Sequence, residues 1–359
     1  MSKTANNMTT FPQRSASDVN HLQVVVPNKG DFALLAPGSA VFNCTAAVVS
    51  MALDMLECRA SVLVLKDITR QIRDLNPLNV ELRNIGEAQI EPKIRDFLAS
   101  IRKSFPHVLV TDENCMVYKN GRTTKRDCTG AFNPKTAAVI ELNHKLMQRM
   151  VTCYKTLLNK DSQMGKEHFR TIHLRLSITM AHELVHLYNL YLRRQRSQHT
   201  PPDVTYGGYG DKRTGESGRY WERRIFGGVV EMRDNSDKME IIGIRDTNYT
   251  KCSRITTEAI NGILARDLNR WLEPGSPLIE LEHKPAGTAR IDAFKWRTNY
   301  FECLPTPPDN VQGPPELSGK QIIRLVGSGM LASASYSLCG QDLRAFAREP
   351  RTRLRQVQA

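Results

Sequence analysis

The sequence contains eight cysteines but no C-x-x-C pair. This absence excludes a zinc ribbon, which needs such pairs to surround its metal. The polar start of the chain also lacks the apolar segment of a signal peptide. We therefore expect reduced thiols in an intracellular protein, either cytoplasmic or nuclear. The scattered cysteines are Cys44, Cys58, Cys115, Cys128, Cys153, Cys252, Cys303 and Cys339.

Long apolar runs are missing as well. No stretch reaches the roughly 20 residues that a membrane-spanning helix needs, so the sequence predicts no membrane partner. The chain also shows no internal repeat. Hydrophobic residues nevertheless make up 40% of the 359 residues, which is enough for a substantial core in one large domain or two modest ones.

Acidic residues are fewer than basic ones, 37 against 50, and the formal net charge is +13. A basic chain favours polyanionic partners such as nucleic acid. However, the basic residues are spread along the chain, and no helix-turn-helix or aromatic-basic pattern supports nucleic-acid recognition. We expect a disordered tail over 1–20, a folded domain over 21–340 and a basic tail over 341–359. That last tail is either a solvated end or a phosphate-binding or nuclear-import segment.

What the chain does have is His-Glu-Leu-Val-His at residues 182–186, an H-E-x-x-H arrangement. Side chains four residues apart share one face of a helix, so the rings of His182 and His186 can reach the same point. Two neutral imidazole nitrogens suit Zn²⁺. Glu183 can then approach a water molecule at the metal without binding the metal itself. This pattern indicates a hydrolase with zinc as cofactor and Glu183 as general base.

The pattern lies on a predicted helix over about 168–194. This segment contains no proline or glycine and ends in a basic run, which suits a helix C-terminus. Apolar residues recur at helical spacing beside the histidine face and predict a buried stripe. The stripe is formed by Leu174, Ile178, Ala181, Leu184, Val185 and Tyr188.

A catalytic zinc site uses three protein ligands and keeps a place for water. A metzincin would have Gly and His three and six residues after His186, where this chain has Asn189 and Leu192, so that class is excluded. The third ligand must come from elsewhere. His199 and Asp203, in the loop that follows the helix, are two candidates.

Two further candidates, Glu216 and Glu222, lie on a second predicted helix over about 215–226. Glu216 falls in the first turn, where unpaired N–H groups favour a carboxylate for purely structural reasons. It could also orient a zinc-binding histidine, or bind the metal itself. Gly218 lowers the stability of this helix by about 1 kcal/mol. A close approach between the two helices would explain why glycine stands there.

The pairing of His-Glu-Leu-Val-His with a downstream Glu-x-x-x-Phe-Gly-Gly resembles the zinc peptidases of the gluzincin type, in particular the clostridial neurotoxin light chains. The resemblance implies that His182, His186 and Glu222 hold zinc and that Glu183 is the base. It covers only residues 182–228 and does not imply a neurotoxin's substrate. The paired pattern is also similar to one in uncharacterised fungal proteins.

The same resemblance extends to Arg297 and Tyr300, because an Arg-x-x-Tyr pair downstream of the metal ligands stabilises the oxyanion in that family. A solvated arginine and a half-buried tyrosine are the plainer interpretation of these two residues. Before the first helix, residues 136–143 predict a strand. Zincin folds place an edge strand beside the active-site helix, where substrate pairs with it, although an interior strand fits this apolar run equally well.

The predicted fold is therefore α+β, a zincin-like metallopeptidase with a mixed N-terminal lobe and a mostly helical C-terminal lobe around a zinc cleft. The predicted function is zinc-dependent hydrolysis of peptide bonds in a peptide or protein substrate. One alternative is a non-catalytic protein in which zinc joins two helices. Another is a basic nucleic-acid-associated module that uses the 341–359 tail. The sequence predicts neither an oligomeric state nor a particular substrate.

Overall fold

The computed structural model describes most of the chain between residues 21 and 280. The described ranges are 21–28, 31–76, 79–112, 120–126, 130–159, 163–194, 200–201, 203–204, 215–235, 238–244, 252–272 and 279–280. The predicted tails at 1–20 and 341–359 lie outside these ranges, as do His199, Arg297 and Tyr300. What the sequence predicts for them stays a prediction.

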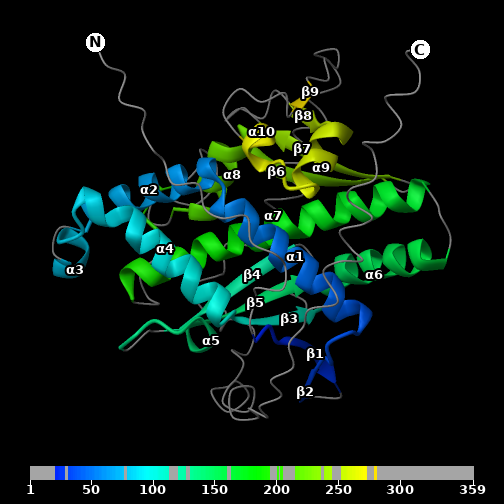
Figure 1. The fold of residues 1–359 in the computed structure, drawn as a ribbon, viewed down its shortest axis with the longest axis horizontal. Helices are drawn as coiled ribbons and strands as arrows, with labels where there is room; N and C mark the ends of the chain where they lie inside the picture. Colours follow the sequence, from blue (N-terminus) through cyan, green and yellow to red (C-terminus); the bar gives the residue numbers. More distant parts are fainter. Residues whose placement is uncertain are drawn as a thin grey trace, which may run out of the picture.

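A five-stranded mixed sheet forms one side of the fold (Figure 1). Its strand order is β2-β1-β3-β5-β4. β1, β3 and β5 run parallel to one another, while β2 and β4 pair antiparallel with β1 and β5. The strands are β1 (Val24–Asn28), β2 (Asp31–Leu34), β3 (His107–Thr111), β4 (Gly121–Lys125) and β5 (Ala138–Asn143).

The strand predicted over 136–143 is present as β5, preceded by the short helix α5 (Pro134–Ala137). It lies between β3 and β4, so of the two positions that the sequence left open, edge and interior, it occupies the interior one. Its first five residues are all buried, as suits an interior position. The outer place on this side of the described sheet belongs to β4, whose sequence Gly-Arg-Thr-Thr-Lys is polar and half-buried, as suits an edge.

Helices pack on this sheet and around each other. Apart from α5, those of the first half are α1 (Ala40–Glu57), α2 (Arg59–Asp74), α3 (Val80–Arg83), α4 (Glu87–Lys103) and α6 (His144–Asn159). By length and composition α1 could cross a membrane, which differs from the expectation that no stretch is long and apolar enough. Most of α1 is buried inside the fold, where it packs against α6 and the helix that follows.

That following helix, α7 (Gln163–Arg193), is the predicted active-site helix and begins five residues earlier than expected. Figure 1 shows it crossing the middle of the molecule, in contact with α1, α6 and β4. Its middle is buried on nearly every side, including Leu184, Leu187 and Tyr188, each with no exposed surface. The helix ends at Arg193, and the next residue, Arg194, takes a left-handed conformation while its N–H donates to the Leu190 carbonyl. The histidine pair is therefore carried by a helix that is packed on several sides.

The described residues after α7 form a smaller unit with three helices and a four-stranded antiparallel sheet, in the order β6-β7-β8-β9. β6 and β7 pair as an antiparallel hairpin. This part is mixed rather than mostly helical, because its alternating segments pair as strands. Its elements are α8 (Ser217–Phe226), β6 (Val229–Asn235), β7 (Lys238–Ile244), β8 (Cys252–Ile255), α9 (Thr257–Leu264), α10 (Leu268–Trp271) and β9 (Ile279–Glu280). The coarse α+β prediction is confirmed.

Candidate metal centre

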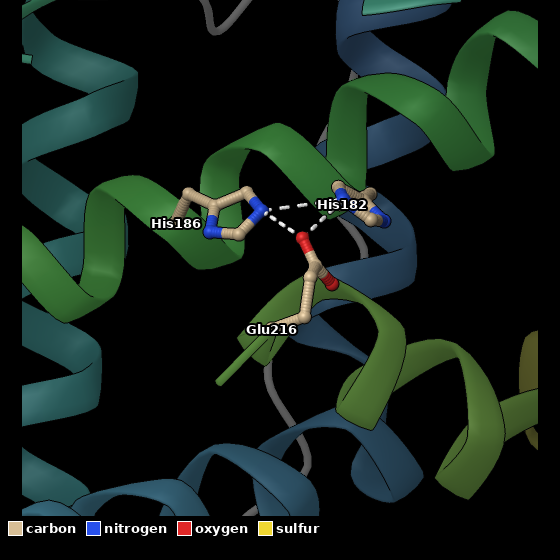
Figure 2. A group of neighbouring side chains, drawn as sticks. All are labelled: His182, His186 and Glu216. Carbon is tan, nitrogen blue, oxygen red and sulfur yellow. Dashed lines mark hydrogen bonds and ion pairs between the residues drawn. The ribbon is translucent and has the colours of Figure 1, made fainter. Parts of the chain in front are cut away.

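The two histidines of the H-E-x-x-H pattern converge, as their spacing predicts. His182 Nε2 and His186 Nε2 lie 3.2 Å apart, and the ring centroids are 5.0 Å apart. Both side chains lie on the face of α7 that meets α8, where His182 is only 9% exposed. Figure 2 shows the two rings facing a common point above the start of α8. The local part of the sequence prediction is therefore met.

The third donor at this point is Glu216. Its Oε1 lies 3.1 Å from His182 Nε2 and 2.5 Å from His186 Nε2 (Figure 2). Its other oxygen, Oε2, accepts from the backbone N–H of Arg219 at 2.5 Å and caps the N-terminus of α8. One carboxylate thus serves both purposes that the sequence left open, since one oxygen caps the helix and the other faces the histidines.

The chain before α8 is held so that Glu216 reaches this place. The Gly215 N–H donates to the Thr200 carbonyl at 2.7 Å, and the Glu216 N–H donates to the Val204 carbonyl at 3.0 Å. Thr200 is itself anchored on α7, because the Asn189 amide donates to its hydroxyl at 2.8 Å. A Cβ on Gly215 would lie 1.9 Å from the Pro201 carbonyl oxygen, so only glycine permits this close approach.

Gly218 has the role that the sequence suggested, a close approach between two helices. A Cβ at this position would lie 2.4 Å from Cδ2 and 2.5 Å from Nε2 of His182. Because real side chains do not come that close, the His182 ring occupies the space that glycine leaves empty. Glycine at position 218 makes α8 less stable than alanine would, but it allows the first turn of α8 to contact His182, a candidate metal ligand.

Glu222 was expected to be the third ligand, but it lies on the Nδ1 side of His182, outside the cluster of His182, His186 and Glu216. Its Oε1 lies 2.6 Å from Nδ1 of His182, the ring nitrogen that faces away from the cluster. Its Oε2 accepts from the Arg219 guanidinium and from the Val230 N–H, each at 2.9 Å. Glu222 is 3% exposed, and both of its oxygens are engaged. It orients His182 from behind, and Glu216 stands where the resemblance puts Glu222.

Both histidines thus have a partner on the far side of the ring. Ser217 Oγ lies 3.3 Å from Nδ1 of His186, and Glu222 Oε1 lies 2.6 Å from Nδ1 of His182. An Nδ1–H directed at such a partner leaves the Nε2 lone pair free to bind a cation, and it also fixes the ring orientation. Ser217 was not foreseen as a site residue. Its position directly after Glu216 is the signal that could have identified it.

Glu183 lies beside this cluster and faces β4. The Thr123 hydroxyl lies 2.7 Å from Glu183 Oε2, and Glu183 is 6% exposed. Lys125, two residues along the same side of β4, is close enough to be influenced by both Glu183 and Glu216. Burial lowers the pKa of Lys125, while the two carboxylates oppose that shift. Thr123 and Lys125 could not be predicted as site residues, because they lie about 60 residues before Glu183 and strand pairing brings them here.

The remaining predicted donor inside the described residues is Asp203. Asp203 is exposed. Among the residues that the structure describes, one group of side chains could hold a metal ion, and it consists of His182, His186 and Glu216 without Asp203. His199, the other loop candidate, lies outside those residues. The described loop residues contribute to the site by holding Glu216 in place.

The distances within the cluster fit a tetrahedral ion. With bonds of about 2.0–2.1 Å, two donors on a tetrahedral zinc lie about 3.3 Å apart. The His182–His186 and His182–Glu216 separations of 3.2 Å and 3.1 Å match this value. The His186–Glu216 separation of 2.5 Å would have to widen by several tenths of an ångström. Two imidazoles and one carboxylate are also a donor set that zinc prefers.

The cluster shifts the pKa values of its members. Burial alone would lower the pKa of His182, but Glu216 and Glu222 outweigh it and raise the pKa to about 10. Burial would likewise raise the pKa of Glu216, whereas the charges and hydrogen bonds of the two histidines hold it well below its usual value. In the metal-free protein, a protonated His182 therefore bridges two ionised carboxylates.

This arrangement predicts a pH dependence of stability for the metal-free protein. The His182 pKa is raised from 6.5 to about 10 on folding, so its contribution is complete below pH 6.5 and is lost as the pH rises toward 10. The loss amounts to at most about 5 kcal/mol in the free energy of unfolding. Urea unfolding at pH 6.5, 8 and 9.5 in the presence of a chelator measures it.

The matched control for this stability prediction is Glu216→Gln, which removes a partner that raises the His182 pKa. We expect the decrease in stability between pH 6.5 and 9.5 to be clearly smaller in this variant. Equal decreases in the two proteins would contradict the electrostatic account, since other groups titrate identically in both.

Comparison of the chain with protein-family models, with curated proteins and with solved structures found no match.

Proposed function

We propose that the protein is a zinc-dependent peptidase. The observation that carries the proposal is the convergence of His182 Nε2, His186 Nε2 and Glu216 Oε1 on one point, with the Glu183 carboxylate on the same helix. The donor set remains of the gluzincin type that the sequence resembles, with the glutamate moved from Glu222 to Glu216. Zinc held by this set would lower the pKa of a water molecule to about 7 and polarise a carbonyl group.

The residues of the chain supply the proton transfers. Glu183 accepts the proton of the attacking water and delivers it to the leaving amine, so that the amine departs as a neutral group. Glu222 and Ser217 hold the two histidine rings by their Nδ1 atoms, so that both Nε2 atoms face the reaction. Lys125 adds a positive charge near Glu183 and Glu216, and a cation there would stabilise negative charge that develops on the carbonyl oxygen.

We further propose that substrate binds along β4. This strand is the outermost of the described sheet on the side of α7, and it runs antiparallel to its neighbour β5. An outer strand has backbone N–H and C=O groups directed away from the sheet, and an extended peptide can pair with them. The strand contacts α7 at the turn that carries Glu183, so a peptide added to it would run past the base.

Three protein donors favour catalysis over a purely structural role. Structural zinc sites are normally closed by four protein ligands, whereas catalytic ones keep a position for water. Within the described residues, the cluster offers three donors. The nucleic-acid alternative rests on the tail at 341–359, which lies outside those residues, and it stays a prediction.

The test uses Glu183→Gln in the full-length chain. We expect it to bind one zinc ion like the wild type and to lose about 100- to 10,000-fold in peptide hydrolysis, because an amide cannot take up the proton of water. Zinc content by atomic emission and cleavage of a peptide library by mass spectrometry are the two measurements. Glu167→Gln, the same change at an exposed position of α7, serves as the control.

Two outcomes would contradict the proposed function. Wild-type protein loaded with zinc that cleaves no peptide in the library would reject a peptidase. Hydrolysis by Glu183→Gln at the rate of the wild type and of Glu167→Gln would reject Glu183 as the base.

A further inference from the structure

The side of β4 that faces α7 touches the helix at the turn that carries Glu183. A Cβ on Gly121 would lie 2.6 Å from Thr179 Cγ2 and 3.3 Å from Glu183 Cγ. Side chains alternate along a strand, so Gly121, Thr123 and Lys125 share this side. Glycine at the first of these positions lets the strand approach closely enough for Thr123, two residues later, to reach the glutamate.

The Thr123 hydroxyl has two acceptors on a single residue. Its Oγ1 lies 2.7 Å from Glu183 Oε2 and 3.1 Å from the Glu183 carbonyl oxygen. A hydroxyl carries one proton and can donate to one acceptor at a time. The shorter, charge-assisted bond goes to the carboxylate, since ionised acceptors form the stronger bond. The carbonyl oxygen is a second acceptor within reach of the same proton.

We propose that Thr123 is the positioning residue of Glu183, holding Oε2 so that Oε1 is the oxygen that exchanges protons with water and with the leaving amine. This inference rests on the proposed function in assigning Glu183 the role of base. The carboxylate takes up and releases the proton at Oε1, while the Thr123 proton stays on Oγ1 throughout. No bond to Thr123 forms or breaks.

The second acceptor explains how Glu183 can still move. When the carboxylic acid turns to deliver its proton, the Thr123 hydroxyl can rotate to the Glu183 carbonyl at 3.1 Å. A buried donor without a partner costs about 1–3 kcal/mol, and the carbonyl removes that cost. Thr123 therefore holds the base in the resting state without preventing its motion during turnover.

A simple structural tie between β4 and α7 is the competing explanation, and matched variants separate the two. Thr123→Val keeps the size and branching of the side chain but removes the hydroxyl, whereas Thr123→Ser keeps the hydroxyl. Thr124→Val makes the same change one residue further along β4, on the opposite side, where the hydroxyl donates to Glu141 Oε1 at 2.8 Å.

Crystal structures of the zinc-free full-length proteins report the position of Glu183 without reference to activity. We expect the Glu183 side chain to leave its present conformation in Thr123→Val and to keep it in Thr123→Ser and in Thr124→Val. An unmoved Glu183 in Thr123→Val would overturn the proposal. If that variant does not fold, Thr123→Ala takes its place with the same criterion.

Kinetics of the zinc-loaded proteins on one peptide substrate give the second measurement. We expect kcat to fall about 10- to 100-fold in Thr123→Val, with KM within about twofold and zinc content unchanged, because a misplaced base slows proton transfer but not binding. Thr123→Ser should recover kcat to within about threefold of the wild type. A wild-type kcat in Thr123→Val overturns the proposal. Wild-type protein that cleaves no peptide refutes the peptidase, and the crystal structures still decide whether Thr123 positions Glu183.

Discussion

Replacing Gly218 by alanine is expected to abolish tight zinc binding and, with it, peptide hydrolysis. The new Cβ would lie 2.4–2.5 Å from three atoms of the His182 ring. The ring is the part that can move, and any movement breaks its contacts with Glu222 and Glu216 together. We expect zinc affinity to fall at least about 100-fold, because a ligand and its orienting carboxylate are lost in one step.

The same substitution should also lower the stability of the metal-free protein, because displacing the His182 ring breaks its ion pairs with Glu216 and Glu222. The preference of a helix for alanine over glycine, about 1 kcal/mol, offsets only part of that loss. Gly86→Ala is the control, since a Cβ there meets nothing within 4 Å. Calorimetric zinc titration and urea unfolding of both variants measure the two effects. A Gly218→Ala protein with wild-type zinc affinity would contradict the close approach of α8 to His182.

The sequence predicted the local part of this site and missed the part that depends on packing. His182, Glu183 and His186 lie within one and a half turns of a single helix, so their relative placement follows from helix geometry alone. The meaning of Gly218 followed from the weakness of glycine in helices. These inferences needed no knowledge of how α7 and α8 meet.

The choice between Glu216 and Glu222 did need that knowledge. The two residues are six positions apart, so they lie at different heights and on different sides of α8. Which one faces the histidines depends on which end of α8 approaches α7. The glycines that flank Glu216 were the available signal, because a Cβ at Gly215 or Gly218 would meet the neighbouring chain. They indicate that the N-terminal end makes the close contact.

The partner strand of the site could not be predicted for a similar reason. Residues 121–125 are short and polar and carry little strand signal, whereas the apolar run at 136–143 carries a strong one. An interior strand needs apolar residues on both faces, and an edge strand does not. The apolar run therefore marked the interior strand β5, while the edge strand β4, where we propose that substrate binds, carried the weaker strand signal.

Glu216 and Glu222 should differ sharply when each is replaced. Glu216→Asn keeps an oxygen that can cap α8, because asparagine is among the best N-cap residues, but it is one methylene too short to reach the histidines. We therefore expect a folded protein that no longer binds zinc stoichiometrically and hydrolyses no peptide. Loss of metal cannot then be ascribed to loss of the helix cap, as it could be for Glu216→Ala.

The Glu222→Gln variant should instead still bind zinc, with an affinity about 10- to 100-fold lower than that of the wild type. This is the usual effect of losing a partner that orients a metal-binding histidine. The carboxylate of Glu222 accepts on both sides, from His182 Nδ1 through Oε1 and from Arg219 and Val230 through Oε2. An amide can accept on one side only, so one set of donors loses its partner. Zinc titration of both variants decides the matter. The reverse order, with zinc lost in Glu222→Gln and retained in Glu216→Asn, would restore Glu222 as the ligand and refute the geometry described for Glu216.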